Sequence, residues 1–241
     1  MLILDSARIT DLPGNAFYIP NFITPEEEER ILNKINSAPL PRWTQLSHRR
    51  LQTWPSALTK SNTLLAAPLP DWLHEPIIHP RLESLGCFAD APHQAPNHVL
   101  VNEYRPGQGI MPHEDGPAYY PLVATVSLAG SIVLDLYEKK EQEGGIHDQD
   151  TAPSFRILQE PRSLLITTGS LYSQYLHGIA DRLTDENLTP EAICNWDFLG
   201  EPESYSATRS YERQTRISLT YRDVLKVAKL GNSVKFLNRG R

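Results

Sequence analysis

The spacing of apolar side chains predicts helices in the first third of the chain. Residues 25–37 place apolar side chains at helical intervals. Thr24 suits the N-cap of this helix, Pro25 its first position, and Glu27 can complete a capping box. The four glutamates at positions 26–29 are expected to form a solvated first turn that suits the helix dipole. Two shorter segments also have helical patterns: residues 70–78 and 80–87.

Alternation of apolar and polar residues predicts short strands in the rest of the chain. A first short strand is expected near residues 17–22. Residues 105–112 form a Gly/Pro-rich loop. Two inserts are expected: a charged, turn-rich stretch near 138–155, and residues 181–214, which lack clear periodicity. The main strands are expected at residues 98–104, 123–128, 132–137, 163–167 and 216–221. Helices followed by many strands predict a mostly β, α+β fold, a sandwich or barrel with an N-terminal helical layer.

Composition narrows the class of protein. The 241 residues suit one globular domain, and the formal net charge of −6 disfavours binding of nucleic acid by bulk electrostatics. Any contact with nucleic acid therefore needs a local basic patch. The two cysteines lie far apart and fit a reducing compartment. No signal peptide or membrane span is apparent, so we expect a cytoplasmic or nuclear protein. We expect it to be a monomer.

The residues that suggest chemistry begin with His113 and Asp115. Two positions apart in a strand, they point to the same side and can reach one metal ion. The His-x-Asp pattern alone is weak, because roughly 0.4 matches arise by chance in such a chain. A surface pair is then the simpler interpretation. His177, beyond the strand at 163–167, can complete a triad on one face of an octahedron and leave three positions open, although a single loop histidine is more often a surface residue.

The last predicted strand carries an unusual row of polar residues. On one side it presents Arg216, Ser218, Thr220 and Arg222. An inward guanidinium is costly unless it meets an anion. A dicarboxylate such as 2-oxoglutarate could supply one through a bidentate contact. The alternative is that Arg216 pairs with a protein carboxylate and Arg222 lies in solvent.

The order of these motifs resembles the 2-oxoglutarate/Fe(II) dioxygenases. Asn102-x-Tyr104 before His-x-Asp, and Arg-x-Ser-x-x-x-Arg at the end, resemble the AlkB family of nucleic-acid dealkylases, most closely its sixth-homologue branch. The most specific phrases are WTQLSHRRLQTW, NHVLVNEYRPGQGIMPHEDGPAYYP, EPRSLL and LHGI. The likeness spans residues 17–56, 97–138, 161–180 and 216–222, and the two inserts show no clear likeness.

The resemblance implies a double-stranded β-helix, a jelly-roll or cupin-like barrel. Residues 97–225 would form this core. Residues 1–96 would form an N-terminal helical extension with a lid at about 39–56 that resembles the nucleotide-recognition lid of the family. Residues 226–241 would be a C-terminal tail.

The resemblance also implies roles for individual residues. His113, Asp115 and His177 would hold Fe(II). Arg216 would pair with the far carboxylate of 2-oxoglutarate, and Arg222 would lie near its 1-carboxylate or the substrate. The residues expected around 2-oxoglutarate are Asn102, Tyr104, Arg216, Ser218 and Arg222.

The lid and the residues after His-x-Asp supply candidate substrate contacts. Arg49 and Arg50 offer cations and Trp54 an aromatic plane, as an unstacked base requires. The alternative is a buried Trp54 that anchors a loop, with two solvated arginines. Tyr119 and Tyr120 can line a pocket or join the core, and we expect at least one in the core.

The implied reaction couples conversion of 2-oxoglutarate and O2 to succinate with hydroxylation of a substrate carbon. An N-methyl substrate would release formaldehyde and the free base. The expected substrate is alkylated RNA or single-stranded DNA. A protein or small-molecule substrate is an alternative, as is a weakly active reader of modified nucleic acid. The intact triad and Arg216 argue against a reader without activity.

Overall fold

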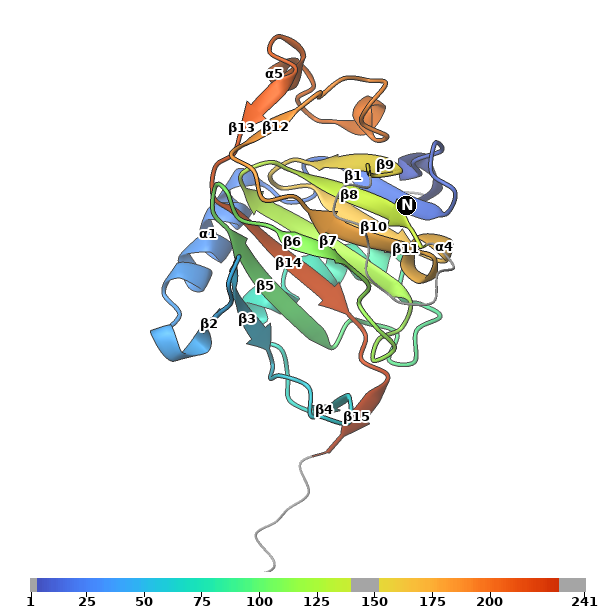
Figure 1. Ribbon diagram of the computed structural model, residues 1–241. Helices are drawn as coiled ribbons and strands as arrows, with labels where there is room; N and C mark the ends of the chain where they lie inside the picture. Colours follow the sequence, from blue (N-terminus) through green and yellow to red (C-terminus); the bar gives the residue numbers. More distant parts are fainter. Residues whose placement is uncertain (1–3, 140–151, 230–241) are drawn as a thin grey trace, which may run out of the picture.

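The alternating segments pair into two antiparallel sheets that form the body of the molecule (Figure 1). The computed structural model describes residues 4–139 and 152–229. The larger sheet, here the major sheet, contains, in spatial order, β1 (Asn15–Ile19), β10 (Leu164–Thr168), β7 (Leu122–Ala129), β14 (Arg216–Arg222), β5 (His98–Tyr104), β3 (Arg50–Trp54) and β2 (Thr44–Gln45). The minor sheet contains β6 (Ile110–His113), β11 (Tyr175–Ile179), β8 (Ile132–Glu138) and β9 (Phe155–Gln159).

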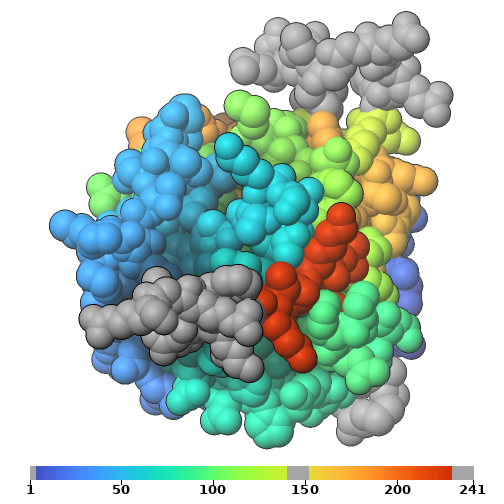
Figure 2. Space-filling model, turned by 90° about the horizontal axis from the view of Figure 1, so that it is seen from below, coloured from blue at the N-terminus to red at the C-terminus, as the bar shows by residue number. Residues whose placement is uncertain are grey.

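Two small strand pairs and several short helices complete the described chain. In the antiparallel pair at the top of Figure 1, β12 (Thr184–Glu186) joins β13 (Ser210–Glu212). In the parallel pair, β4 (Thr63–Leu65) joins β15 (Lys226–Ala228), and Figure 2 shows these two segments, cyan and red, together on one face. The helices are α1 (Pro25–Asn36), α2 (Asp71–His74), α3 (Glu83–Leu85), α4 (Ser170–Ser173) and α5 (Glu203–Ser206), with helical turns at Leu4–Ala7, Leu40–Arg42, Ile77–Leu82 and Trp196–Phe198.

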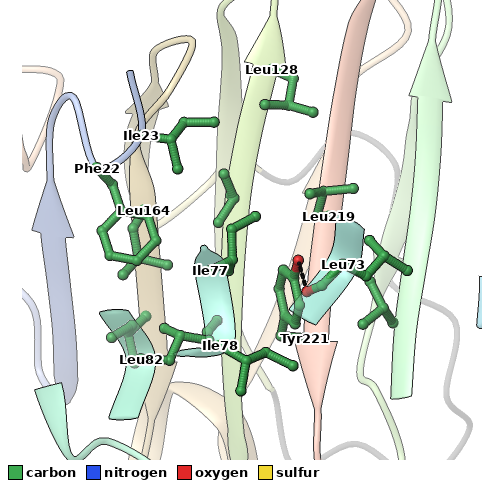
Figure 3. Close-up of a cluster of buried hydrophobic side chains, with 14 of the residues drawn as sticks. Phe22, Ile23, Leu73, Ile77, Ile78, Leu82, Leu128, Leu164, Leu219 and Tyr221 are labelled. Carbon is green, nitrogen blue, oxygen red and sulfur yellow. Dashed lines mark hydrogen bonds between the residues drawn. The ribbon is translucent and has the colours of Figure 1, made fainter. Parts of the chain in front are cut away.

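The main core lies between the outer face of the major sheet and the helical layer (Figure 3). On β14, Leu219 and Tyr221 point to this core, whereas the polar residues that alternate with the apolar ones point inward and line a cavity: Arg216, Ser218, Thr220 and Arg222. The Tyr221 hydroxyl donates to the carbonyl of Leu73 at 3.0 Å, which ties α2 to the sheet. The strict alternation of β14 therefore separates an apolar outer core from a polar interior.

Helix α1 forms as its sequence predicts. The Thr24 hydroxyl accepts from the Glu27 amide at 3.2 Å, and the Glu27 carboxylate accepts from the Thr24 amide at 2.8 Å, so the capping box is complete. The expectation that the glutamates of the first turn are all solvated is wrong for Glu28. This side chain is buried, accepts from the Ala129 amide at 2.8 Å and pairs with Arg162 at 3.1 Å.

The helical predictions for 70–78 and 80–87 are only partly correct. The segment forms α2, an irregular helical stretch at Ile77–Leu82 and α3, and His79 has non-helical dihedral angles. Pro76 and Pro80 lack the amide hydrogen that a continuous helix would need.

Segments far apart in sequence combine in the sheets. Residues 1–96 supply β1, β2 and β3 to the major sheet, in addition to the helical layer. Strand β9 was not predicted, and the 181–214 insert folds into short elements. Most of the predicted insert at 138–155, and residues 230–241 of the predicted tail, lie outside the described residues. No helix in the described ranges has both the length and the apolar character needed to cross a membrane.

Candidate active site

The pairing of β6 with β11 brings three predicted metal ligands together. His113 lies directly opposite His177 in the register, with ring centroids 4.3 Å apart. Asp115 follows two residues after His113, and one ligand atom from each of the three residues lies within 4.8 Å of the others. Gly109 permits the close approach of the strands, because a Cβ there would lie 2.1 Å from the Ile179 carbonyl oxygen. The arrangement suits one divalent metal ion.

Both imidazoles are prepared to act as neutral ligands. The Nδ1 of His113 lies 2.9 Å from the carbonyl oxygen of Met111, so Nδ1 carries the proton and the Nε2 lone pair is free. Burial lowers the pKa of His113, and burial lowers the pKa of His177 to about 4. Metal binding requires the neutral form, and this form is therefore the resting state near neutral pH.

The loop that carries Asp115 is fixed from several sides. Arg222 donates to the Asp115 carboxylate. The Tyr172 hydroxyl donates to the Gly116 carbonyl at 3.0 Å, and Lys139 forms an ion pair with Glu114. These contacts restrict the carboxylate to the side of the cavity where the two histidines lie.

A cavity of about 290 Å³ lies between the inner faces of the two sheets and includes the triad. The sequence predicted which residues would surround the co-substrate, and the structure brings all five to this cavity: Asn102, Tyr104, Arg216, Ser218 and Arg222. Ser218 and Asn102 are register partners on β14 and β5. The cavity thus combines a metal-binding triad with a polar wall from the major sheet.

Arg216 is the most informative residue of that wall. It is 2% exposed, and its Nη2 donates to Ser127 Oγ at 2.9 Å and to Gln159 Oε1 at 3.0 Å. Its Nε has no partner, and burial lowers its pKa to about 10. Within residues 4–139 and 152–229 it forms no ion pair with a carboxylate. A buried cation held by neutral groups fits a ligand that brings its own carboxylate.

The structure decides between the alternatives that the sequence left open for these arginines. Arg216 does not pair with a described protein carboxylate, and Arg222 is 7% exposed rather than solvated. Ser127 and Gln159 were not anticipated, because a single neutral polar residue in a strand carries no motif. Only the pairing of their strands reveals their contact with Arg216.

The predicted lid places its residues on two different faces. Arg49 lines the cavity, and its Nε donates to Asn102 Oδ1 at 3.4 Å. Arg50 lies on the opposite face of β3, where it binds both carboxylate oxygens of Glu103, at 2.8 and 2.6 Å, and covers the Trp43 ring at 4.1 Å. Alternation along the strand is the reason: Arg50 is paired in the register with Glu103.

Trp54 shares the outer face with Arg50, away from the cavity. The guanidinium of Arg42 lies 3.8 Å from its ring centroid, and Trp72 packs against its edge at 5.6 Å. Tyr119 lines the cavity, whereas Tyr120 packs against the main core. Of the four predicted substrate contacts, the structure brings Arg49 and Tyr119 to the triad, but not Arg50 and Trp54.

Comparison with known proteins places this site in a family. The model of the 2OG-Fe(II) oxygenase superfamily matches residues 15–222. The chain belongs to this superfamily. The oxygenase is 39% identical over 226 residues to a Danio rerio protein named "Probable RNA/DNA demethylase ALKBH6", covering 93% of this chain and 92% of the relative. It is 26% identical to Xenopus tropicalis "tRNA (carboxymethyluridine(34)-5-O)-methyltransferase alkbh8", covering 88% of this chain and 32% of that protein.

A solved structure agrees with the fold. The structure titled "The structure of OsALKBH1" superposes with a TM-score of 0.54 and 14% identity, covering 88% of this oxygenase and 99% of that chain. The prediction of a double-stranded β-helix is confirmed, as is the resemblance to AlkB proteins. The oxygenase is a dioxygenase that depends on Fe(II) and 2-oxoglutarate.

Proposed function

We propose that this dioxygenase removes alkyl groups from nucleic acid by oxidation. The observation that carries the proposal is the near-full-length similarity to the Danio rerio protein whose name describes a probable RNA/DNA demethylase. The position of the triad inside a cavity supports it further, because a base must leave its stack to enter such a site. RNA and single-stranded DNA offer such bases at the lowest energetic cost.

Each predicted site residue receives a role in this proposal. His113, Asp115 and His177 hold the iron. When bound, iron and 2-oxoglutarate would supply the oxidising chemistry by which O2 gives one oxygen atom to an alkyl carbon and the other to succinate, as 2-oxoglutarate is converted to succinate and CO2. Arg222 orients Asp115 through its direct contact with that carboxylate, and so keeps the ligand aimed at the metal.

The wall of the major sheet binds the co-substrate. Arg216 pairs with its far carboxylate, and its unpartnered Nε supplies a further donor. Asn102, Tyr104 and Ser218 add hydrogen bonds, and burial raises the pKa of Tyr104, so its hydroxyl stays protonated and can donate. Because Arg216 and the metal triad hold opposite ends of the co-substrate, the cavity favours a dicarboxylate of one particular length.

Arg49 and Tyr119 contact the substrate from the open side. Arg49 is the lid cation that lines the cavity, and Tyr119 offers an aromatic surface beside Asp115. Arg50 and Trp54 act on the outer face, where their contacts with Glu103 and Arg42 hold β3 in place.

The iron site is tested with purified protein, Fe(II), O2 and 2-oxoglutarate. Without substrate, slow release of succinate is expected. His113→Ala abolishes it because a ligand is lost, whereas His74→Ala, at an exposed position of α2 outside the cavity lining, leaves it unchanged. Normal succinate release by His113→Ala would remove the proposed iron site.

The substrate is tested by mass spectrometry of methylated RNA and DNA oligonucleotides, single- and double-stranded, after incubation with the loaded enzyme. Loss of a methyl group with release of formaldehyde is the expected result, strongest for single strands. Unchanged oligonucleotides across the panel, together with normal basal succinate release, would exclude nucleic acid and direct the search to proteins and small molecules.

A further inference from the structure

The charges that line the cavity are unbalanced. Three arginines, Arg49, Arg216 and Arg222, face two carboxylates, Glu114 and Asp115. The two histidines add no charge, because a histidine must be neutral to bind a metal ion. Bound Fe(II) adds two positive charges and 2-oxoglutarate two negative ones, so loading with both leaves the excess of one positive charge in place.

Neither carboxylate is free to meet a positively charged ligand. Asp115 contacts Arg222 and belongs to the proposed iron triad. Glu114 is paired with Lys139, whose Nζ is held in position by the Ser173 carbonyl at 2.7 Å. Arg49, in contrast, has no carboxylate partner among residues 4–139 and 152–229, and its Nε donates to the neutral side chain of Asn102.

The aromatic rings near the metal site are also largely occupied by cations. Arg222 lies 4.9 Å from the centroid of Tyr119, and Arg216 lies 5.8 Å from that of Tyr104. A ring that already faces a guanidinium stabilises a second cation poorly, because the two positive charges repel each other across it. The remaining tyrosine of the cavity, Tyr172, is fixed by its hydrogen bond to Gly116.

We propose that this cavity selects methylated bases that are electrically neutral and rejects methylated bases that carry a positive charge. This choice of substrate rests on the proposed function. A cationic base would leave water for a cavity with excess positive charge, in which no lining carboxylate is free and two of the three tyrosine rings already face an arginine. A base with a methyl group on an exocyclic nitrogen keeps its neutral π system and avoids the repulsion.

Two isomeric methylated bases, one neutral and one cationic, test whether the cavity prefers the neutral form. A single-stranded oligonucleotide with one 6-methyladenine is neutral at that base, whereas the same oligonucleotide with one 1-methyladenine carries a positive charge there at pH 7 and has the same mass. Binding is measured by fluorescence anisotropy with Fe(II) and 2-oxoglutarate in the absence of oxygen, so no turnover interferes. One unit charge at about 8 Å predicts at least about tenfold tighter binding of the neutral isomer at an effective dielectric constant near 20.

Charge reversal at Arg49 tests whether the positive charge of the cavity causes this preference. Arg49→Glu is expected to lower binding of every oligonucleotide, but to shift the ratio of the two affinities by about tenfold or more toward the cationic isomer. Arg49→Gln should give an intermediate ratio. Arg30→Glu, at an exposed position on α1, makes the same change in net charge and should leave the ratio unchanged. Retained binding of 2-oxoglutarate by each variant confirms that it is folded.

Tighter binding of 1-methyladenine by the wild-type protein would overturn the inference while leaving nucleic-acid demethylation intact. An unchanged ratio in Arg49→Glu would overturn it as well. If both isomers bind no better than the unmodified oligonucleotide and neither loses its methyl group, the proposed function fails and this inference fails with it.

Discussion

Arg216 is held by two neutral side chains, Ser127 and Gln159, and we expect Gln159→Glu to weaken binding of 2-oxoglutarate. Gln159 Oε1 lies 3.0 Å from Arg216 Nη2, and Arg216 has no described carboxylate partner. The substitution supplies an internal carboxylate of nearly the same shape. Arg216 would then be neutralised by the protein itself, at an attraction of about 4 kcal/mol for charges about 4 Å apart in an effective dielectric constant near 20.

The same substitution would repel 2-oxoglutarate. Its far carboxylate would approach Arg216 about 6 Å from the new carboxylate, which gives a repulsion of about 3 kcal/mol and raises the half-saturating concentration of 2-oxoglutarate about a hundredfold. Gln159→Met keeps the size but removes one neutral hydrogen bond, and it should raise that concentration by at most about tenfold. Iron binding should stay normal in both variants because Gln159 is not among the proposed ligands.

The assay is basal succinate release as a function of 2-oxoglutarate concentration, with bound iron measured by elemental analysis. A Gln159→Glu enzyme that saturates at the wild-type concentration of 2-oxoglutarate would refute the assignment of Arg216 to the far carboxylate. A loss of iron binding would instead show that the substitution disturbs the fold around the triad.

Two further predictions concern buried groups outside the site. His98 is 1% exposed, and burial lowers its pKa from 6.5 to about 4. The unfolded chain therefore takes up a proton that the folded chain refuses as the pH falls below 6.5, and at pH 5 this lowers the free energy of unfolding by about 2 kcal/mol. Urea unfolding of the metal-free protein at pH 7 and pH 5 should show a smaller difference for His98→Gln; an equal difference would contradict the assignment. Arg213 and Asp185 form a buried ion pair with two contacts of 2.7 Å, so Arg213→Met should cost about 3–5 kcal/mol of stability in urea unfolding, and Arg213→Met with Asp185→Leu should recover most of it. If the double variant is no more stable than Arg213→Met, the loss does not come from the unpaired carboxylate.

The local pattern of the sequence determined the elements with strong periodicity. The predicted strand at 98–104 matches β5 residue for residue, and that at 216–221 is one residue short of β14. The capping box fixed the start of α1 for the same reason: its signals lie within four residues of one another. Spacing also identified His113 and Asp115 as a pair, although the expectation that both lie in one strand is wrong: β6 ends at His113, and Asp115 lies in the loop that follows.

The tertiary structure decided which side of each strand faces the cavity and what lies across from it. The sequence presented Arg49 and Arg50 as equivalent cations. In the structure Arg49 lines the cavity, whereas the register of β3 against β5 places Arg50 beside Glu103 on the opposite face. Strand β9, with Gln159, acquires its role only from contact with Arg216 on β14. Alternation tells which residues share a face. It does not tell which neighbour that face meets, because strand pairing depends on long-range contacts that no local window contains.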